Sequence, residues 1–309
     1  MSLPLTDPLL RLAAADQRVV LLTGDVPPGQ LQPLADQLPG RCFDSGTADA
    51  RLIQQAVSMA LSGLRPIVLG AVSHLTTRCL DSIHSQICRH RARVTLVGHD
   101  APPRGGDDST VCRHDVALLR PLPNLAIACP ADELEFTAVL RASLSRTSAT
   151  YIRLAGTTGT RIHSEPTEIR PGRFIPVRAG SELCLLASGD VLGEALEAAR
   201  LLESSGVEAA VVSCPSINPL DADWLDTNLH RFPLAVTLED HGLLGGFGAA
   251  IAEWLVDSPT HRTPLWRCGT PEVFTGETLD ANSRRATLEP SRLAAQILKQ
   301  LRRRRKLAA

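Results

Sequence analysis

Short, continuous apolar runs alternate along the chain with longer segments in which apolar residues recur every three or four positions. Runs of this length suit strands buried on both faces of a parallel sheet, and the longer spacing is typical of amphipathic helices. In the first half, the predicted strands are Arg18–Thr23, Pro66–Val72, Arg93–Gly98 and Ala149–Leu154. Helices are predicted between them, the clearest over residues 50–64 and 132–145. This alternation predicts an α/β domain with a mostly parallel sheet.

The same alternation returns in the second half. Strands are predicted at Leu183–Ala187, Val207–Cys214 and Leu234–Leu238, with a helix over residues 191–204 and another opened by the glycine-rich turn 242–248. That turn lacks the full G-x-G-x-x-G nucleotide fingerprint, so close backbone packing at a helix start explains it better. We therefore predict two α/β domains with mostly parallel sheets, over residues 1–160 and 181–309. A linker at residues 161–180, rich in turn-forming residues, joins them.

Composition narrows the functional class. The chain has 309 residues, a formal net charge of -1 and 3% aromatic residues, so it offers neither a basic field nor stacking surfaces for nucleic acid. Since no apolar run is long enough to cross a bilayer and the N-terminus does not resemble a signal peptide, we expect a cytoplasmic protein without a membrane partner. Eight scattered cysteines without a C-x-x-C pair favour buried thiols over a zinc site or disulfides.

The one run of like charge is Arg302–Lys306, close to the C-terminus. Terminal residues are poorly ordered unless packing ties them down. We expect a solvated, frayed tail there, and contact with an acidic partner is the alternative.

Asp49 is the only carboxylate of the segment Gly46-Thr47-Ala48-Asp49, which leads into the helix over residues 50–64. A carboxylate in that position either caps the helix or takes part in chemistry. Asp is a frequent N-cap residue, so from this segment alone the cap is the more common role.

The segment Gly46-Thr47-Ala48-Asp49-Ala50 resembles the G-I-A-E-Q motif of transketolases and deoxyxylulose-phosphate synthases. In that family the acidic residue holds the aminopyrimidine ring of thiamine diphosphate and drives it into the imino form. The resemblance implies this role for Asp49, one methylene shorter than the family's Glu. Further family motifs follow in order, among them D-x-x-x-L-R-x-x-P-N at residues 115–124 and E-D-H at residues 239–241.

The resemblance extends to three more residues near the expected cofactor. Asp25 follows the first strand, as in the family's small-Asp-apolar step, although a turn role before Pro27-Pro28 is at least as common. Leu75 takes the place of the aromatic residue that stacks on the ring. Arg78 matches the S-x-F-x-x-R-x-x-D pattern together with Asp81, and a plain surface pair of these two residues remains the alternative.

A polar loop after the strand Arg93–Gly98 resembles the family's donor site. His99 and Asp107 keep the family's spacing, which implies contacts with the donor substrate. The family's next histidine aligns with Val111, and His114 is the candidate to replace it, or else a helix-start residue. Gly156 stands where the family has an arginine that grips the donor phosphate, so the donor is expected not to be a sugar phosphate.

The family's diphosphate-binding domain has no counterpart here: the sequence lacks its G-D-G motif and downstream Asn, which hold Mg²⁺. We therefore expect a C-terminal-half subunit of a split transketolase-like enzyme that transfers a two-carbon ketol or acyl unit in a biosynthetic pathway. An N-terminal-half subunit would carry Mg²⁺ and the rest of the thiamine diphosphate site, in an α₂β₂ assembly in which this chain also pairs with its own copy. The alternatives are a 2-oxoacid dehydrogenase E1 β-like subunit and a non-catalytic scaffold.

Overall fold

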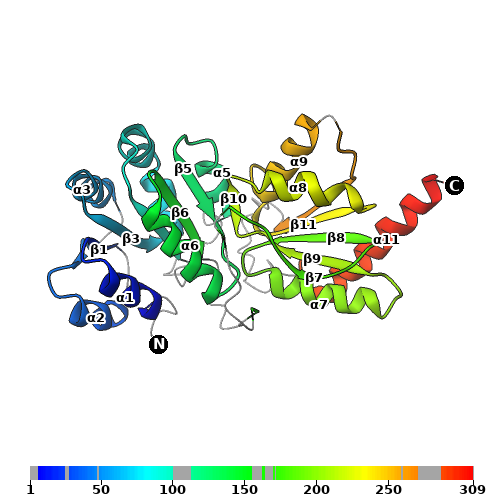
Figure 1. Ribbon diagram of the computed structural model, residues 1–309, viewed down its shortest axis with the longest axis horizontal. Coiled ribbons are helices and arrows are strands. Elements are labelled where there is room, and N and C mark those ends of the chain that lie inside the picture. The colour runs from blue at the N-terminus through cyan, green and yellow to red at the C-terminus, as the bar shows by residue number, and fades with distance from the viewer. Residues whose placement is uncertain are drawn as a thin grey trace, which may run out of the picture. The chain divides into compact units, whose positions relative to one another are not determined.

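The computed structural model describes residues 6–24, 28–46, 49–99, 113–154, 162–163, 170, 172–258, 260–270 and 287–308. The chain divides into two compact units, residues 1–171 and 172–309. Each unit is an α/β layer structure built on its own sheet (Figure 1). The prediction of two α/β domains with mostly parallel sheets is therefore confirmed.

Parallel strands form the centre of the first unit, and six of them follow one another in the order β5-β6-β4-β3-β1-β2. Their bounds are β1 Val19–Gly24, β2 Cys42–Asp44, β3 Arg65–Ala71, β4 Thr95–His99, β5 Leu125–Ala128 and β6 Ala149–Leu154. Nearly every residue of β1, β3, β4 and β6 is buried. Burial on both faces explains why these strands appear in the sequence as unbroken apolar runs.

Helices cover this sheet on both faces. They are α1 Thr6–Ala15, α2 Pro28–Gln37, α3 Ala50–Leu61, α4 Leu80–Ser82, α5 Asp115–Leu119 and α6 Glu133–Ser145, with π-helical turns η1 His74–Arg78 and η2 Ile83–Cys88. Leu9, Leu34 and Phe136 bring α1, α2 and α6 into one apolar cluster with alternate residues of the strands. The intervening strand residues face the other side, where α3 packs on β1 and β3. Helix α2 and the two π-helical turns were not predicted.

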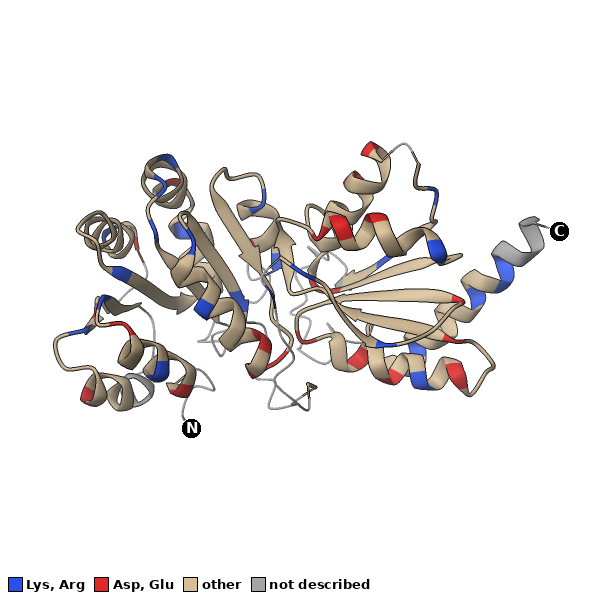
Figure 2. Cartoon of the chain, in the orientation of Figure 1, with Lys and Arg blue, Asp and Glu red and all other residues tan. Residues whose placement is uncertain are grey.

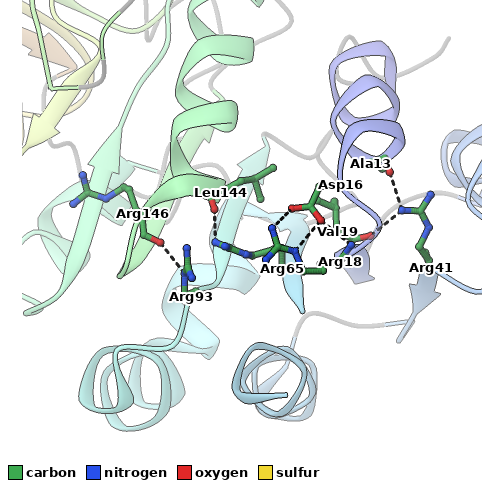
Figure 3. A network of polar contacts seen from close by, with 9 residues as sticks. All are labelled: Ala13, Asp16, Arg18, Val19, Arg41, Arg65, Arg93, Leu144 and Arg146. Atoms are coloured by element: carbon green, nitrogen blue, oxygen red, sulfur yellow. Dashed lines mark hydrogen bonds and ion pairs between the residues drawn. The ribbon is translucent and has the colours of Figure 1, made fainter. Parts of the chain in front are cut away.

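Arginines line the amino-terminal edge of the first sheet (Figure 3). Arg41 donates to the carbonyl of Ala13 at 2.8 Å, at the end of α1, and Arg65 donates to the carbonyl of Leu144, at the end of α6. Since the last carbonyls of a helix lack partners within it, these cations satisfy them and complement the helix dipole. Arg18 pairs with Asp16, and the hydrogen bonds from Arg18 lower the pKa of that carboxyl to about 2. This edge therefore has a structural role.

The second unit contains a five-stranded sheet in the order β12-β11-β8-β9-β7, with only β7 antiparallel to its neighbour. Its strands are β7 Ile175–Arg178, β8 Leu183–Ser188, β9 Ala209–Ser213, β11 Ala235–Gly242 and β12 Leu265–Thr270, and the short strand β10 spans Ser216–Asn218. Its helices are α7 Leu192–Glu203, α8 Ala222–Asn228, the 3₁₀ turn η4 Leu229–Arg231, α9 Phe247–Asp257 and α11 Pro290–Ala308.

The glycine-rich turn before α9 packs tightly, as the sequence indicated. A Cβ on Gly248 would lie 2.6 Å from Thr237 Oγ1 and 2.7 Å from Glu239 Oε1. The Gly248 amide donates to Glu239 Oε1 at 3.0 Å, and the Phe247 amide donates to His241 Nε2 at 3.1 Å. Glu239 and His241 are both fully buried. The E-D-H segment thus fastens the start of α9 to the end of β11, which supports a structural role for His241.

The C-terminal run is helical, so the expectation of a frayed tail was wrong. Helix α11 continues without interruption from Pro290 to Ala308 and includes Arg302–Lys306. Packing anchors it, because Leu293 and Ile297 are fully buried and the helix lies along α7. Propagating an anchored helix requires no new nucleation, which is the physical reason the basic run extends it.

Candidate functional site

The carboxyl ends of the strands in the first unit form one continuous edge. Strand register places His99 of β4 beside Ala71 of β3 and Leu154 of β6, and Gly24 of β1 beside Gly70. Open parallel sheets bind their ligands at this edge. The residues that follow these strands are therefore candidates for a ligand-binding site.

Asp49 lies just beyond β2, at the start of α3, and it is the N-cap of that helix. Its Oδ1 accepts the backbone amides of Arg51 at 2.9 Å and Leu52 at 3.3 Å. Gly46 provides the turn before it, with φ of 74°, a backbone conformation that favours glycine. The cap role suggested by the sequence is present, and it uses one of the two carboxylate oxygens.

The second oxygen of Asp49 faces the side chain of Arg51, whose Nη2 lies 3.2 Å from Oδ2. Burial would raise the pKa of Asp49, but the hydrogen bonds from the Arg51 guanidinium and from the two backbone amides outweigh it, so the pKa lies below its ordinary value. The Arg51 side chain is 88% exposed. Exposed ion pairs of this kind contribute little stability, so the contact between Arg51 and Oδ2 is a weak one.

His99 ends β4 and is buried, with 8% of its surface exposed. The backbone at Gly98, just before His99, packs closely against the side chains of Tyr151 and Val72. A Cβ on Gly98 would lie 2.7 Å from Tyr151 Oη and 3.1 Å from Val72 Cγ2. Only glycine fits between β4 and the Tyr151 ring without displacing one of them. Tyr151 therefore helps to set where His99 stands at the edge.

A buried polar network lies behind His99. Tyr151 Oη donates to Asp115 Oδ2 at 2.6 Å, and Arg153 Nε lies 3.0 Å from the same oxygen. Asp115 and Tyr151 are fully buried and Arg153 is 4% exposed. Burial, followed by the charge of Asp115, raises the pKa of the Tyr151 phenol, so the phenol remains a hydrogen-bond donor. The network ties the start of α5 to β6.

The remaining predicted site residues differ in their placement. Leu75 in η1 is fully buried, so within this chain it presents no face to a ligand ring. Arg78 and Asp81 are both exposed on the surface. His114 is half-buried and directly precedes α5, the helix-start position named as its alternative.

Asp25 and Asp107 lie outside the described residues, as do the altered positions Val111 and Gly156. Asp49 and His99 thus stand at the carboxyl edge on α3 and β4.

The roles of Arg51 and of the Asp115 network were not predicted from the sequence. Tyr151 and Arg153 carried a usable signal, because they stand two residues apart in a strand and so point to the same face. A charged residue on a buried strand face requires a partner of opposite charge. Asp115 is that partner, and only the fold brings it within reach.

The described residues contain neither a disulfide bond nor a cluster of metal-ligating side chains. Seven cysteines there are free thiols, and six of them are buried. Burial raises the pKa of Cys88 to about 11 and, with the charge of Glu239, that of Cys268 to about 12. No group of three or more potential ligand side chains that could hold a metal occurs in the described residues. Among them there is also no helix both long and apolar enough to traverse a bilayer.

Two α/β domains, the first with a carboxylate at a helix start on the carboxyl edge of its sheet, define a two-domain α/β protein. Two family profiles match the chain: "Transketolase, pyrimidine binding domain" over residues 4–157 and "Transketolase, C-terminal domain" over residues 172–286. The chain belongs to the transketolase and deoxyxylulose-phosphate synthase family, of which it carries these two domains.

Known relatives agree with this assignment. The chain is 35% identical over 277 residues to a 1-deoxy-D-xylulose-5-phosphate synthase of Heliobacterium modesticaldum, covering 87% of this chain and 42% of that protein. A second such enzyme, from Geobacter sulfurreducens, is 32% identical over 89% of this chain and 45% of its own length. The chain thus spans less than half the length of these curated relatives.

Solved structures place the fold in the same family. A protein described as a split-gene transketolase, an inactive β4 tetramer, superposes with a TM-score of 0.87 at 27% identity, covering 96% of both chains. A transketolase mutant of Pichia stipitis shows the same fold at 15% identity, with a TM-score of 0.76, over 97% of this chain and 45% of its own.

Proposed function

We propose that this chain is the C-terminal half of a thiamine-diphosphate-dependent enzyme that transfers a two-carbon ketol or acyl unit. The family relationship across both domains supports the chemistry. The observation that carries the proposal is the position of Asp49, a carboxylate at the start of α3 that stands where the family has its acidic residue.

The two carboxylate oxygens of Asp49 can serve different purposes, one in capping α3 and the other in binding the cofactor. Oδ1 is fixed by the amides of Arg51 and Leu52, which orients the carboxylate, and Oδ2 lies against the exposed guanidinium of Arg51. We assign to Oδ2 the contact with the aminopyrimidine nitrogen. Displacing Arg51 and excluding water would raise the pKa of Asp49 towards the value that proton exchange requires.

Asp49 is the residue of this chain that suits contact with thiamine diphosphate. Leu75 is fully buried and therefore does not offer a surface to the cofactor ring. When bound, thiamine diphosphate supplies the electron sink for the transferred unit. We assign His99 and Asp107 to the donor, His114 to proton transfer beside them, and Asp25 and Arg78 to the rim of the cofactor. Gly156 in place of the family's arginine suggests a donor without a phosphate group.

The diphosphate and its Mg²⁺ would be bound by a second polypeptide of the N-terminal-half type. Support for this division comes from the split-gene transketolase that covers 96% of this chain, and from the 42% share of the curated relative. Association with a copy of this chain would complete an α₂β₂ assembly. Calorimetry of the purified two-component complex is expected to show thiamine diphosphate binding that depends on Mg²⁺, and its absence would contradict this proposal.

Substitutions at Asp49 test the chemistry separately from the fold. Asp49→Asn keeps an N-cap residue but removes the proton-exchanging group. In the complex, we expect it to lower cofactor-dependent turnover of 2-oxo-acid and ketose donors by at least about a hundredfold, the usual contribution of an acid–base group. Asp49→Glu, with the family's longer side chain, serves as the matched variant that retains activity. Undiminished turnover in Asp49→Asn would favour a non-catalytic scaffold, in which Asp49 is a cap alone.

A further inference from the structure

The C-terminal helix has two halves with different surroundings. Leu293, Ala294 and Ile297 in its first half are buried, and the helix lies along α7 there. Its last turns extend past the ends of the strands of the same unit (Figure 1). Lys299, Arg302 and Arg303 are all exposed. The Lys and Arg positions of the described part of α11 are blue in Figure 2. The packing that holds the helix in place therefore does not use its basic end.

Positive charge is concentrated in this end. Six cations lie between Lys299 and Lys306, and the rest of the chain would carry a formal net charge of -7 without them. Helix α11 itself contains no Asp or Glu. Lys299, Arg302 and Arg303 follow the i, i+3, i+4 spacing that places residues on one face of a helix. Like charges at this spacing repel one another, and an anionic partner would relieve the repulsion.

The same face is hollowed. A depression of about 550 Å³ is lined by Ala295, Leu298, Lys299, Arg302 and Arg303. Two apolar side chains thus stand next to three cations. We propose that this basic groove, defined by the five lining residues, docks an acidic protein segment that places an apolar side chain against Ala295 and Leu298 and its carboxylates against the cations.

Other polyanions fit the groove less well. A nucleic acid has no aliphatic side chain for the apolar part, and α11 carries no aromatic residue on which a base could stack. A membrane-surface helix needs a broad apolar face with large apolar or aromatic residues, whereas the apolar residues of the basic groove are Leu298 and Ala295. Charge complementarity combined with a small apolar contact is typical of protein recognition. This inference does not depend on the proposed enzyme activity.

Fluorescence anisotropy with the full chain tests the docking. The probe is a labelled synthetic peptide in which glutamates and leucines recur at helical spacing, and the matched probe has glutamine in place of every glutamate. We expect saturable binding of the first peptide only, weakened by salt because screening reduces charge contacts. Arg302→Glu with Arg303→Glu is expected to lower its affinity at least about tenfold.

Two control variants separate the groove from general charge and from folding. Arg89→Glu with Arg231→Glu changes the net charge equally at exposed positions elsewhere and should leave binding unchanged. Arg302→Gln with Arg303→Gln keeps good helix formers and should still weaken binding. Leu298→Gln should weaken binding without altering its salt dependence. The proposal fails if the acidic peptide does not bind, if Arg302→Glu with Arg303→Glu binds it as well, or if an RNA oligonucleotide or phosphatidylserine vesicles bind the groove more tightly.

Discussion

Tyr151 Oη donates a hydrogen bond of 2.6 Å to Asp115 Oδ2, and both side chains are fully buried in the first unit. The bond links β6 to the first residue of α5. Arg153 balances the charge of Asp115, with its Nε 3.0 Å from the same oxygen. The buried carboxylate of Asp115 is compensated by a cation and a phenol donor, so removing either partner leaves polar atoms without compensation.

Tyr151→Phe should destabilise the first unit. The substitution keeps the ring but removes the donor, leaving one carboxylate lone pair buried without its partner, at a cost of about 1–3 kcal/mol. Hydrogen–deuterium exchange is expected to rise in β6 and α5. All three tryptophans, at 224, 254 and 266, belong to the second unit, so their fluorescence is an internal control that should not change. Unchanged exchange in β6 would contradict the role of the phenol.

Gly98→Ala should disturb the surroundings of Tyr151 from β4, the strand next to β6. The new Cβ would lie 2.7 Å from Tyr151 Oη and 3.0 Å from Cε2, so the ring or β4 must shift, at a cost of about 1–3 kcal/mol. Combination with Tyr151→Phe should recover part of that loss, because the nearest atom is then gone. Gly193→Ala in α7 is the matched control: its Cβ meets nothing within 4 Å, and alanine favours a helix. Additive effects at positions 98 and 151 would argue against a direct contact.

The sequence predicted the layers of this molecule well. Apolar runs such as Pro66–Val72 coincide with strands, because parallel strands buried on both faces need no alternation of polar and apolar residues. Helix α2 escaped prediction, since Pro33 inside it lowers helix propensity and packing of Leu34 in the core offsets this cost. The prediction that residues 302–306 would fray was wrong because it used the local sequence alone. The packing of α11 on α7, which anchors the helix, is seen only in the folded structure.

The candidate site was predictable only in part. Asp49 could be placed at a helix start from local pattern, because capping depends on neighbours in the chain. That Leu75 is fully buried could not be foreseen, since burial depends on elements far apart in sequence. The same holds for Asp115, whose partners Tyr151 and Arg153 lie more than thirty residues away. Long-range pairing of buried charges requires the fold.

His163 is expected to make the stability of the first unit depend on pH. Its Nε2 lies 2.7 Å from Glu135 Oε1, and its backbone amide donates to Asp132 Oδ2 at 2.9 Å. The hydrogen bond to Glu135 raises the pKa of His163, burial opposes this, and the charges of Glu135 and Asp132 add to the rise. A raised pKa in the folded state means that the imidazolium stabilises the fold below the ordinary pKa of 6.5.

This contribution should disappear as pH rises through the raised pKa of His163, because the neutral ring then loses its charge interaction with Glu135. Urea unfolding of the first unit, followed by hydrogen exchange at the start of α6, should therefore show stability falling across that range. His163→Gln keeps a hydrogen-bonding side chain without the charge and should flatten the dependence in the same window. Equal pH dependence in both proteins would show that other groups cause it.

Arg51 should control the ionisation of Asp49 in the isolated chain. Its guanidinium lies 3.2 Å from Asp49 Oδ2, and together with the backbone amides of Arg51 and Leu52 it lowers the pKa of the carboxyl against the effect of burial. Arg51→Gln removes the cation but leaves both amides in place, so the pKa of Asp49 should rise. Carboxyl carbon NMR of the chain labelled at aspartate measures this, with Asp16, held by Arg18, as the internal reference that should stay near 2. A rise in both pKa values would indicate a general change in charge, whereas a rise at Asp49 alone would make Arg51 the side chain that a ligand has to displace.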